Sequence, residues 1–419
     1  MNSVIDNIGC EKKRFSLNLF DCFVILYFLH KMLPIVGYYM PSVMFIGLFG
    51  VLMLSSFDRI GRARRINVLG RMLLLMTVSL LTVLEYIATR SIMSLPVYLY
   101  GEFQVILFGF IALSYEHKDR EYKKKYLFWF AIACYLITSL TTIIGNIRYP
   151  MASRFLATGD AMSVALYTSK NIGGFTFIYE IVLLAPLVIY MFKKGMVNKW
   201  FAAGFIALLG YTVVRSEYTT ALLFFFLSLV LLLIPNLTTR KIYVLLGIFI
   251  ILFVINVENI ADLLRRLAQN SESEIFSTRF NELATLLEGG DYIDAGNAGN
   301  RAERYRRSFE TLVNTNLIGR WGDKSMGSIG GHSFILDTMG QYGIIGVIAL
   351  VIIYTTIYNL YIKPHKKENF YPYLFYVYLV AIILAFLNSK TYLFVFMVVF
   401  PTFASTMKEK SIKNLEDNK

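Results

Sequence analysis

Residues 172–192 read IGGFTFIYEIVLLAPLVIYMF, and two lysines, Lys193 and Lys194, follow them directly. Glu180 is the only residue with a charged side chain in this stretch. A helix that crosses a bilayer needs about 20 predominantly apolar residues. The stretch therefore predicts a membrane-spanning helix that carries one carboxyl group.

Apolar stretches of this kind recur along the whole chain, bounded by charged residues or by Gly and Pro. The 419 residues are 56% hydrophobic and 16% charged, with a mean hydropathy of +0.56, which is more apolar surface than a soluble core can hide. This composition excludes disordered, collagen-like and disulfide-scaffold proteins. We expect an all-α polytopic membrane protein with about 12 transmembrane helices. The candidate spans are 17–37, 41–56, 68–88, 96–115, 126–145, 172–192, 200–214, 216–235, 241–257, 333–361, 371–387 and 391–406.

The charges of the connecting loops predict the orientation. If the N-terminus is cytoplasmic, the seven connectors on that side carry 24 basic and 10 acidic residues, so the rest of the chain is nearly neutral. Lys and Arg in short loops stay in the cytoplasm, so we expect both termini there. The basic charge then reflects orientation and contact with anionic membrane lipids. Its scatter over seven loops argues against nucleic-acid binding.

This topology divides the chain into three parts. Residues 1–257 hold helices 1–9, residues 258–332 form a long polar outer loop, and residues 333–419 hold helices 10–12 and a cytoplasmic tail. The outer loop carries 11 acidic and 9 basic residues. We expect it to be a small helical cap, with helices near 260–269 and 300–313. A smaller outer loop covers 146–171.

Several classes of chemistry lack their motifs. The sequence contains no Walker phosphate loop, no HExxH and no pair of cysteines at zinc spacing. It also lacks an Asp-x-Asp of the kind that chelates a metal-bound nucleotide sugar. We therefore expect neither a metal nor a cofactor.

Residues 300–307, NRAERYRR, hold four arginines around Tyr305. On a helix Arg301, Arg304 and Arg307 share a face, while Glu303 can pair with Arg307 four residues later. Planar guanidinium groups bind phosphate oxygens through two hydrogen bonds, so this face fits a diphosphate. The alternative is a solvated basic face with internal ion pairs.

His332 is the one histidine of the four that this topology places at the outer surface. It stands in residues 330–333, GGHS, where the long loop re-enters the membrane. Its ordinary pKa near neutrality suits proton transfer. The alternative is an interfacial histidine beside a helix packed through small residues.

Three further side chains are candidates for a site. Arg215 interrupts an apolar stretch at an outer boundary, where an ionisable residue is often functional, although snorkelling or a salt bridge to Glu217 would also explain it. Glu180 is a candidate for substrate binding or a structural hydrogen-bond partner. Arg154 adds positive charge to the smaller outer loop, which is ordinary loop charge if it has no ligand.

Several segments between Arg215 and Gly346 resemble the motifs of the O-antigen polymerase and ligase family. They are the arginine-rich helix from Arg301, residues 316–322 (NLIGRWG), 331–333 (GHS) and 341–346 (QYGIIG). Arg215-Ser216 is similar to that family's Ser-Arg element in reversed order, and Ser333 stands where many ligases have Asn. The first half of the chain matches in topology alone. Residues 154–157 (RFLA), after Tyr149-Pro150, look more like polysaccharide polymerases than ligases.

The resemblance implies a metal-independent, inverting glycosyltransferase in the bacterial cytoplasmic membrane. Its donor and acceptor would be undecaprenyl diphosphate-linked glycans, with a chain-length regulator as a further partner. It implies catalytic roles for His332, Arg301 and Arg215. Two alternatives remain, a ligase that transfers the glycan to a lipid A core and a flippase that makes no bonds. The expected substrate-binding residues are Arg304, Arg307, Arg154, Glu180 and Tyr305.

Overall fold

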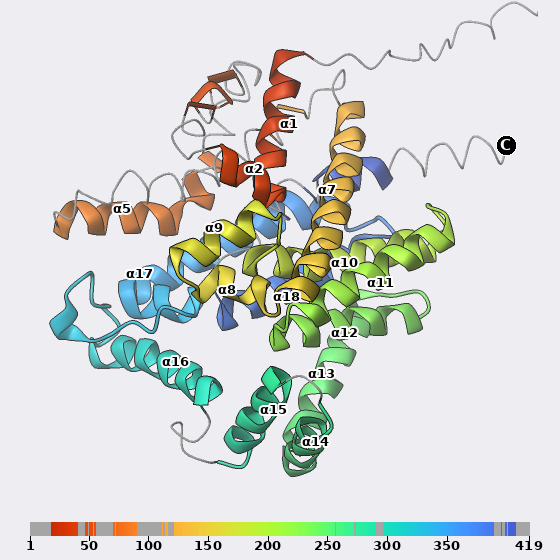
Figure 1. Cartoon of the computed structure of the whole chain (residues 1–419). Helices are drawn as coiled ribbons and strands as arrows, with labels where there is room; N and C mark the ends of the chain where they lie inside the picture. Colours follow the sequence, from red (N-terminus) through yellow and green to blue (C-terminus); the bar gives the residue numbers. More distant parts are fainter. Residues whose placement is uncertain are drawn as a thin grey trace, which may run out of the picture.

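The computed structural model is all-helical in the part that it describes, as the sequence predicted (Figure 1). The described residues are 18–40, 47–48, 50–52, 54–55, 70–71, 73–89, 111, 114–115, 121–255, 257–271, 274–289, 296–388, 395, 399 and 401–407. The labelled helices up to the smaller outer loop are α1 (Leu19–Met32), α2 (Pro34–Tyr39), α5 (Thr77–Thr89), α7 (Glu121–Arg148), α8 (Ala152–Thr158) and α9 (Ala161–Ser169). Those that follow are α10 (Phe175–Lys193), α11 (Lys199–Arg215), α12 (Thr219–Leu233), α13 (Thr239–Ile255), α14 (Val257–Gln269), α15 (Glu274–Leu287), α16 (Gly296–Asn314), α17 (Phe334–Ile357) and α18 (Tyr371–Leu387).

Three of the described helices are long and apolar enough to cross a membrane. They are Lys123–Arg148, Phe175–Lys193 and Phe334–His365, the last of which includes two short helical turns after α17. Shorter apolar helices cover Thr77–Ile87, Thr219–Leu233 and Tyr371–Leu387. The predicted spans 41–56, 96–115 and 391–406 lie largely outside the described residues.

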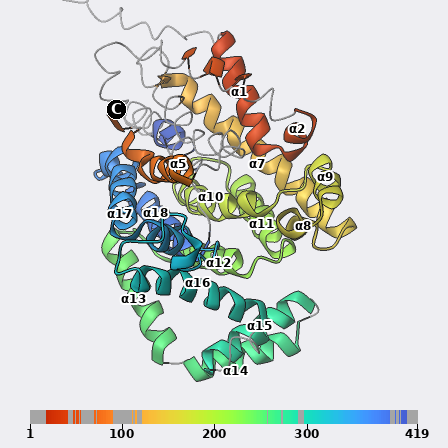
Figure 2. The same ribbon diagram turned by 90° about the vertical axis from the view of Figure 1, so that its left-hand side faces the viewer.

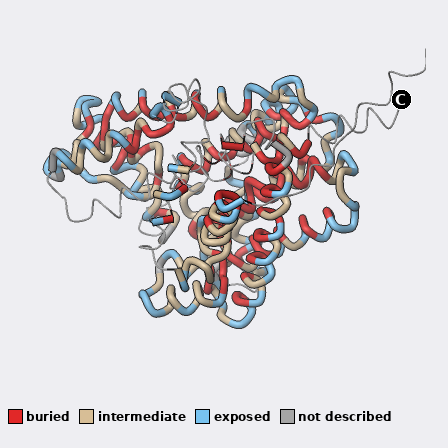
Figure 3. The backbone as a smooth tube through the Cα atoms, turned by 90° about the horizontal axis from the view of Figure 1, so that it is seen from above, coloured by how far each residue is buried: buried red, intermediate tan, exposed pale blue. Residues whose placement is uncertain are grey.

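Helix α10, formed by the stretch that predicted the fold, lies at the centre of the bundle (Figures 1 and 2). It packs against α11, α12 and α18, and its side chains from Phe177 to Met191 are buried. Buried positions run through the interior of the bundle, and exposed positions lie mostly along its outer edges (Figure 3). The core is therefore continuous across helices from both halves of the chain.

Two predicted spans are not single straight helices. The first, 17–37, ends its initial helix at Met32 and restarts at Pro34, because proline has no N–H to donate and suits the first turn of a new helix. The tenth, 333–361, is kinked at Gly343, whose φ of 58° and ψ of −140° lie outside the helical region.

The long polar loop, residues 258–332, contains three helices, which occupy the lower part of Figures 1 and 2. The helices predicted near 260–269 and 300–313 are confirmed as α14 and α16, each slightly longer than expected. The third, α15, was not predicted. It packs against both of the others and so connects them.

Candidate functional site

Helix α16 divides its arginines between two environments. Arg306 and Arg307 both donate to Glu303, at 2.8 and 3.2 Å, and their side chains are about half exposed. Hydrogen bonds from these two arginines lower the pKa of the Glu303 carboxyl group. The predicted Glu303–Arg307 pair is thus confirmed, and it places Arg307 in a surface ion pair. Arg304, three residues before Arg307, bonds instead to His332.

The turn that carries His332 is held by Asp337. One carboxylate oxygen accepts from the Ser308 hydroxyl at 2.6 Å and from the Gly331 N–H at 3.2 Å, and the other accepts from the Ser333 N–H at 3.0 Å. Ser308 belongs to α16, and its hydroxyl oxygen also accepts from the Gly330 N–H at 2.9 Å. These bonds fix the turn against α16.

Two local features explain the residues next to His332. A β-carbon at Gly330 would collide with the carbonyl oxygen of Arg304, so glycine allows the turn to approach the α16 backbone closely. Ser333 caps α17, because its hydroxyl oxygen accepts from the Leu336 N–H at 3.0 Å.

His332 and Arg304 are hydrogen-bonded, with 2.6 Å between Nε2 and Nη1. Guanidinium is always a donor, so Nε2 accepts and the ring proton is assigned to Nδ1. Burial, followed by the charges of Arg304 and Arg301, lowers the pKa of His332. The imidazole is therefore neutral near pH 7 and able to accept a proton once Arg304 releases Nε2.

Arg154 reaches the same region from the smaller outer loop. Helix α8 is anchored to α7 by the N–H of Ser153, which donates to Asn146 at 3.0 Å, and to Tyr218, whose hydroxyl donates to the Ser153 carbonyl at 2.9 Å. Burial, then the nearby charges of Arg279 and Arg301, lowers the pKa of the Arg154 guanidinium. Cationic side chains from α8, α15 and α16 therefore lie within electrostatic range of one another.

Tyrosines surround Arg301. It lies within electrostatic range of Tyr179, Tyr218 and Tyr305. The rings of Tyr179 and Tyr218 are in contact, with centroids 6.2 Å apart. Tyr305, predicted to bind substrate, donates its hydroxyl to the Leu387 carbonyl at 2.6 Å and so ties α16 to the end of α18.

Arg215 lies at the end of α11, where its side chain is half-buried. Its Nε is buried and has no hydrogen-bond partner among the described residues. Arg301 acts on Arg154, Tyr179, Tyr218, Tyr305 and His332, and Arg215 is not among the leading influences on any of them. A buried N–H without a partner is costly, so this guanidinium has capacity for one more acceptor.

Glu180 lies apart from the arginines. Its carboxylate accepts from the Tyr135 hydroxyl of α7 at 3.0 Å, and it lies within electrostatic range of Lys31. The side chain is 7% exposed. These contacts match the structural alternative that the sequence left open for Glu180, rather than a place beside Arg301.

Sequence patterns missed three contributors to this region. Arg279 and Glu282 come from the unpredicted helix α15, and Tyr218 follows Arg215 in a segment considered only for its charge. The spacing of Arg279 and Glu282, three residues apart, is a pattern that could have revealed an ion pair.

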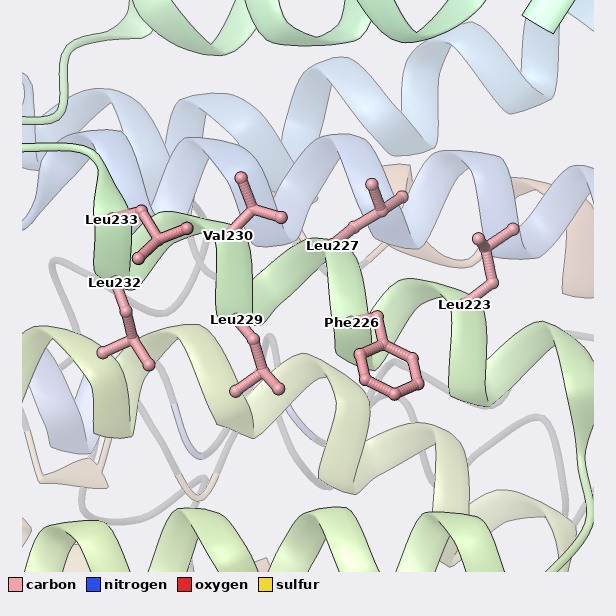
Figure 4. Close-up of a pocket in the computed structure, with 7 residues that line it drawn as sticks. All are labelled: Leu223, Phe226, Leu227, Leu229, Val230, Leu232 and Leu233. Atoms are coloured by element: carbon pink, nitrogen blue, oxygen red, sulfur yellow. The ribbon is translucent and has the colours of Figure 1, made fainter.

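The described residues contain no cluster of His, Cys, Asp and Glu that could hold a metal ion. A pocket of about 400 Å³ opens on α12 and is lined by leucines, Phe226 and Val230 (Figure 4). Its wholly apolar lining suits lipid chains rather than a polar glycan. No family model, curated protein or solved structure matches this chain.

Proposed function

We propose that this protein is a membrane glycosyltransferase that polymerises undecaprenyl diphosphate-linked oligosaccharide repeat units into O-antigen, capsule or exopolysaccharide. The observation that carries the proposal is the convergence of Arg301 and Arg154 beside the Arg304–His332 hydrogen bond. Arginines bind phosphate oxygens, and a neutral imidazole accepts a hydroxyl proton. The sequence motifs add the family resemblance described above.

The proposal includes a topology of about 12 spans in the bacterial cytoplasmic membrane, with both termini in the cytoplasm. It is supported by the apolar helices and by the charge of the connectors. In this orientation α14, α15 and α16 lie at the outer face, where lipid-linked repeats are polymerised. The apolar face of α12 then contacts lipid chains.

The reaction needs little covalent help from the protein. A hydroxyl oxygen of the acceptor glycan attacks the anomeric carbon of the donor, and the bond from that carbon to the diphosphate oxygen breaks. The configuration inverts. Arg301 and Arg154 neutralise the negative charge that grows on the leaving diphosphate, where preorganised donors have their largest effect.

The hydroxyl proton passes to Nε2 of His332. In the structure Nη1 of Arg304 donates a hydrogen bond to that nitrogen, at 2.6 Å. An arriving diphosphate attracts the Arg304 guanidinium more strongly than a neutral imidazole does, because the bond becomes charge-assisted on both sides. Diphosphate binding would therefore expose the base at the moment it is needed.

The direct test incubates the purified protein with a lipid diphosphate-linked repeat unit and separates the products on a gel. Wild type should form a ladder of polymers, and His332→Ala should form none while the protein level stays normal. Arg265→Gln is the matched control, because Arg265 lies in an exposed ion pair with Glu288 and was not assigned to the site. A full ladder from His332→Ala would remove His332 from the mechanism.

The ligase and flippase alternatives predict different glycolipids in a deletion strain. Loss of a polymerase leaves single repeat units attached to the acceptor, whereas loss of a ligase leaves none. A flippase would form no glycosidic bond in the purified reaction. If the wild-type protein forms no polymer in the purified reaction, the result would therefore favour the flippase.

A further inference from the structure

Helix α15 carries an ion pair that is much more buried than those on the surface of α16. Arg279 donates to Glu282 at 2.5 Å, and the two side chains are 18% and 7% exposed. Exposed ion pairs contribute little, but a buried pair loses the hydration of both charges and gives stability only when further bonds compensate. The burial of this ion pair therefore indicates a role other than keeping the protein surface soluble.

Glu282 makes one of those further bonds with the beginning of α16. The carboxylate oxygen that holds Arg279 also accepts from the Ala298 N–H at 3.2 Å. Gly296, the first residue of α16, has φ +52°, and a β-carbon there would collide with the other oxygen of Glu282. Glu282 thus fixes the start of the helix that carries Arg301 and positions Arg279 at the same time.

Arg279 faces the region already described rather than open solvent. Among the charged neighbours of Arg154, it has the largest effect, ahead of Arg301. Arg301 also acts on Arg154, so guanidinium groups from α15 and α16 both oppose the positive charge of Arg154, which Glu217 offsets in part. A group with several negatively charged oxygens would relieve this repulsion.

We infer that Arg279 is a third anion-binding arginine of the proposed site, and that Glu282 is its positioning residue. The inference rests on the proposed function. The ligand group is a diphosphate, either as the head group of a lipid or as free pyrophosphate. Arg279 donates to a diphosphate oxygen while Glu282 keeps the guanidinium beside Arg154.

The first experiment measures binding of farnesyl diphosphate to the full-length protein in detergent by calorimetry. Arg279→Gln should raise the dissociation constant about tenfold, the effect expected for one lost charge-assisted hydrogen bond. Arg265→Gln removes the same charge from an exposed ion pair with Glu288 and should change the dissociation constant less than about twofold. Equal effects of the two substitutions would overturn the role of Arg279.

Titration with inorganic pyrophosphate separates the two sources of the ligand group. If the arginines bind the diphosphate itself, Arg279→Gln weakens pyrophosphate and farnesyl diphosphate by the same factor. If Arg279→Gln weakens farnesyl diphosphate alone, then Arg279 acts on the lipid portion, and its role as an anion ligand is wrong.

Two substitutions of Glu282 separate positioning from charge. Glu282→Gln keeps an oxygen that can accept from Ala298 and Arg279, while it removes a negative charge near the ligand, so farnesyl diphosphate should bind as tightly as in wild type or more tightly. Glu282→Ala removes both bonds and should weaken binding about tenfold. Identical affinities of the two variants would exclude positioning. If Glu282→Ala does not fold, the inference still fails when Glu282→Gln binds more weakly than wild type.

The wild-type result keeps the two proposals apart. If the wild-type protein binds neither farnesyl diphosphate nor pyrophosphate, then the proposed function fails and the inference fails with it. If the wild type binds and Arg279→Gln behaves like Arg265→Gln, then only the inference fails.

Discussion

Arg304 and His332 are joined by one hydrogen bond in which the imidazole accepts. This direction leaves the ring uncharged, and the lowered pKa of His332 has the same effect. A base of this kind works above its pKa and is lost when the pH falls below it. Activity should therefore decline on the acid side of the histidine pKa.

We expect Arg304→Gln to move that decline to higher pH. Burial still lowers the pKa of His332, but the nearest positive charge is gone, so the pKa rises toward its ordinary value of 6.5. The measurement is the pH profile of polymer formation by the purified variant, with Arg306→Gln as a control of equal charge. If the Arg304→Gln variant lost activity at the same acidic pH as the wild type, His332 would not be the group that titrates in the reaction.

The spacing of charged residues along the sequence predicted only part of the contacts that α16 makes. The Glu303–Arg307 pair follows from a separation of four residues, and the structure has it. The helical spacing of the arginines also grouped Arg307 with Arg301 and Arg304. Residue types alone do not show which of these arginines forms an ion pair with a nearby carboxylate. The proximity of Arg279 to Arg154 depends on how α15 and α8 pack, and no local pattern contains it.

At the scale of elements, the break in α17 is stabilised by the loop that follows α16. The Ile344 N–H donates to the Leu317 carbonyl at 2.8 Å, and the N–H groups of Arg320 and Trp321 donate to the carbonyls of Gly340 and Gln341 at 3.2 and 2.9 Å. Backbone groups that the kink removes from the helix are thereby satisfied. The loop and the broken helix form one unit.

Gly343→Ala should disrupt this unit. Its φ of 58° with ψ of −140° is strained for alanine, and the added β-carbon would collide with Leu317 and Ile318. We expect a loss of about 2 kcal/mol or more, seen as a lower melting temperature and weaker activity. The matched control is Gly204→Ala in α11, where a β-carbon meets nothing within 4 Å. Equal melting temperatures for the two variants would contradict this account.

Apolar runs and helix-forming segments predicted most described helices, including α10, α14, α16 and α18. The kink at Gly343 was not predicted, because Gly340, Gly343 and Gly346 have a spacing that also suits close helix packing. The segment that satisfies the kink lies more than 20 residues away in the sequence. Its contribution becomes visible only in the folded chain.

At the scale of the whole molecule, the proposed orientation places two exposed residues on opposite sides of the membrane. Phe309 lies on α16 and is 53% exposed, and Lys366 is an exposed residue of the connector between α17 and α18. In a background with Cys10, Cys22 and Cys134 replaced by serine, a membrane-impermeant maleimide should label Phe309→Cys on intact cells. Lys366→Cys should react only after lysis, and the reverse pattern would invert the topology.

The buried carboxyl group of α10 should matter for stability rather than for chemistry. Glu180→Leu leaves the Tyr135 hydroxyl buried without its partner, which costs about 1–3 kcal/mol. Glu180→Gln keeps an acceptor for that hydroxyl and should be milder. Thermal unfolding in detergent compares the two variants. A selective loss of polymer formation in Glu180→Gln, at an unchanged melting temperature, would instead return Glu180 to the site.

Helix α5, from the N-terminal part of the chain, packs against α17 and contacts its broken region. Tyr342 donates its hydroxyl to Glu85 at 2.7 Å, Gln341 also donates to Glu85, and Tyr342 lies 3.0 Å from the Thr82 hydroxyl. Chimeras that join the N-terminal half of this chain to the C-terminal half of a homologue would separate these partners. A functional hybrid would therefore have to inherit Thr82 and Glu85 together with α17.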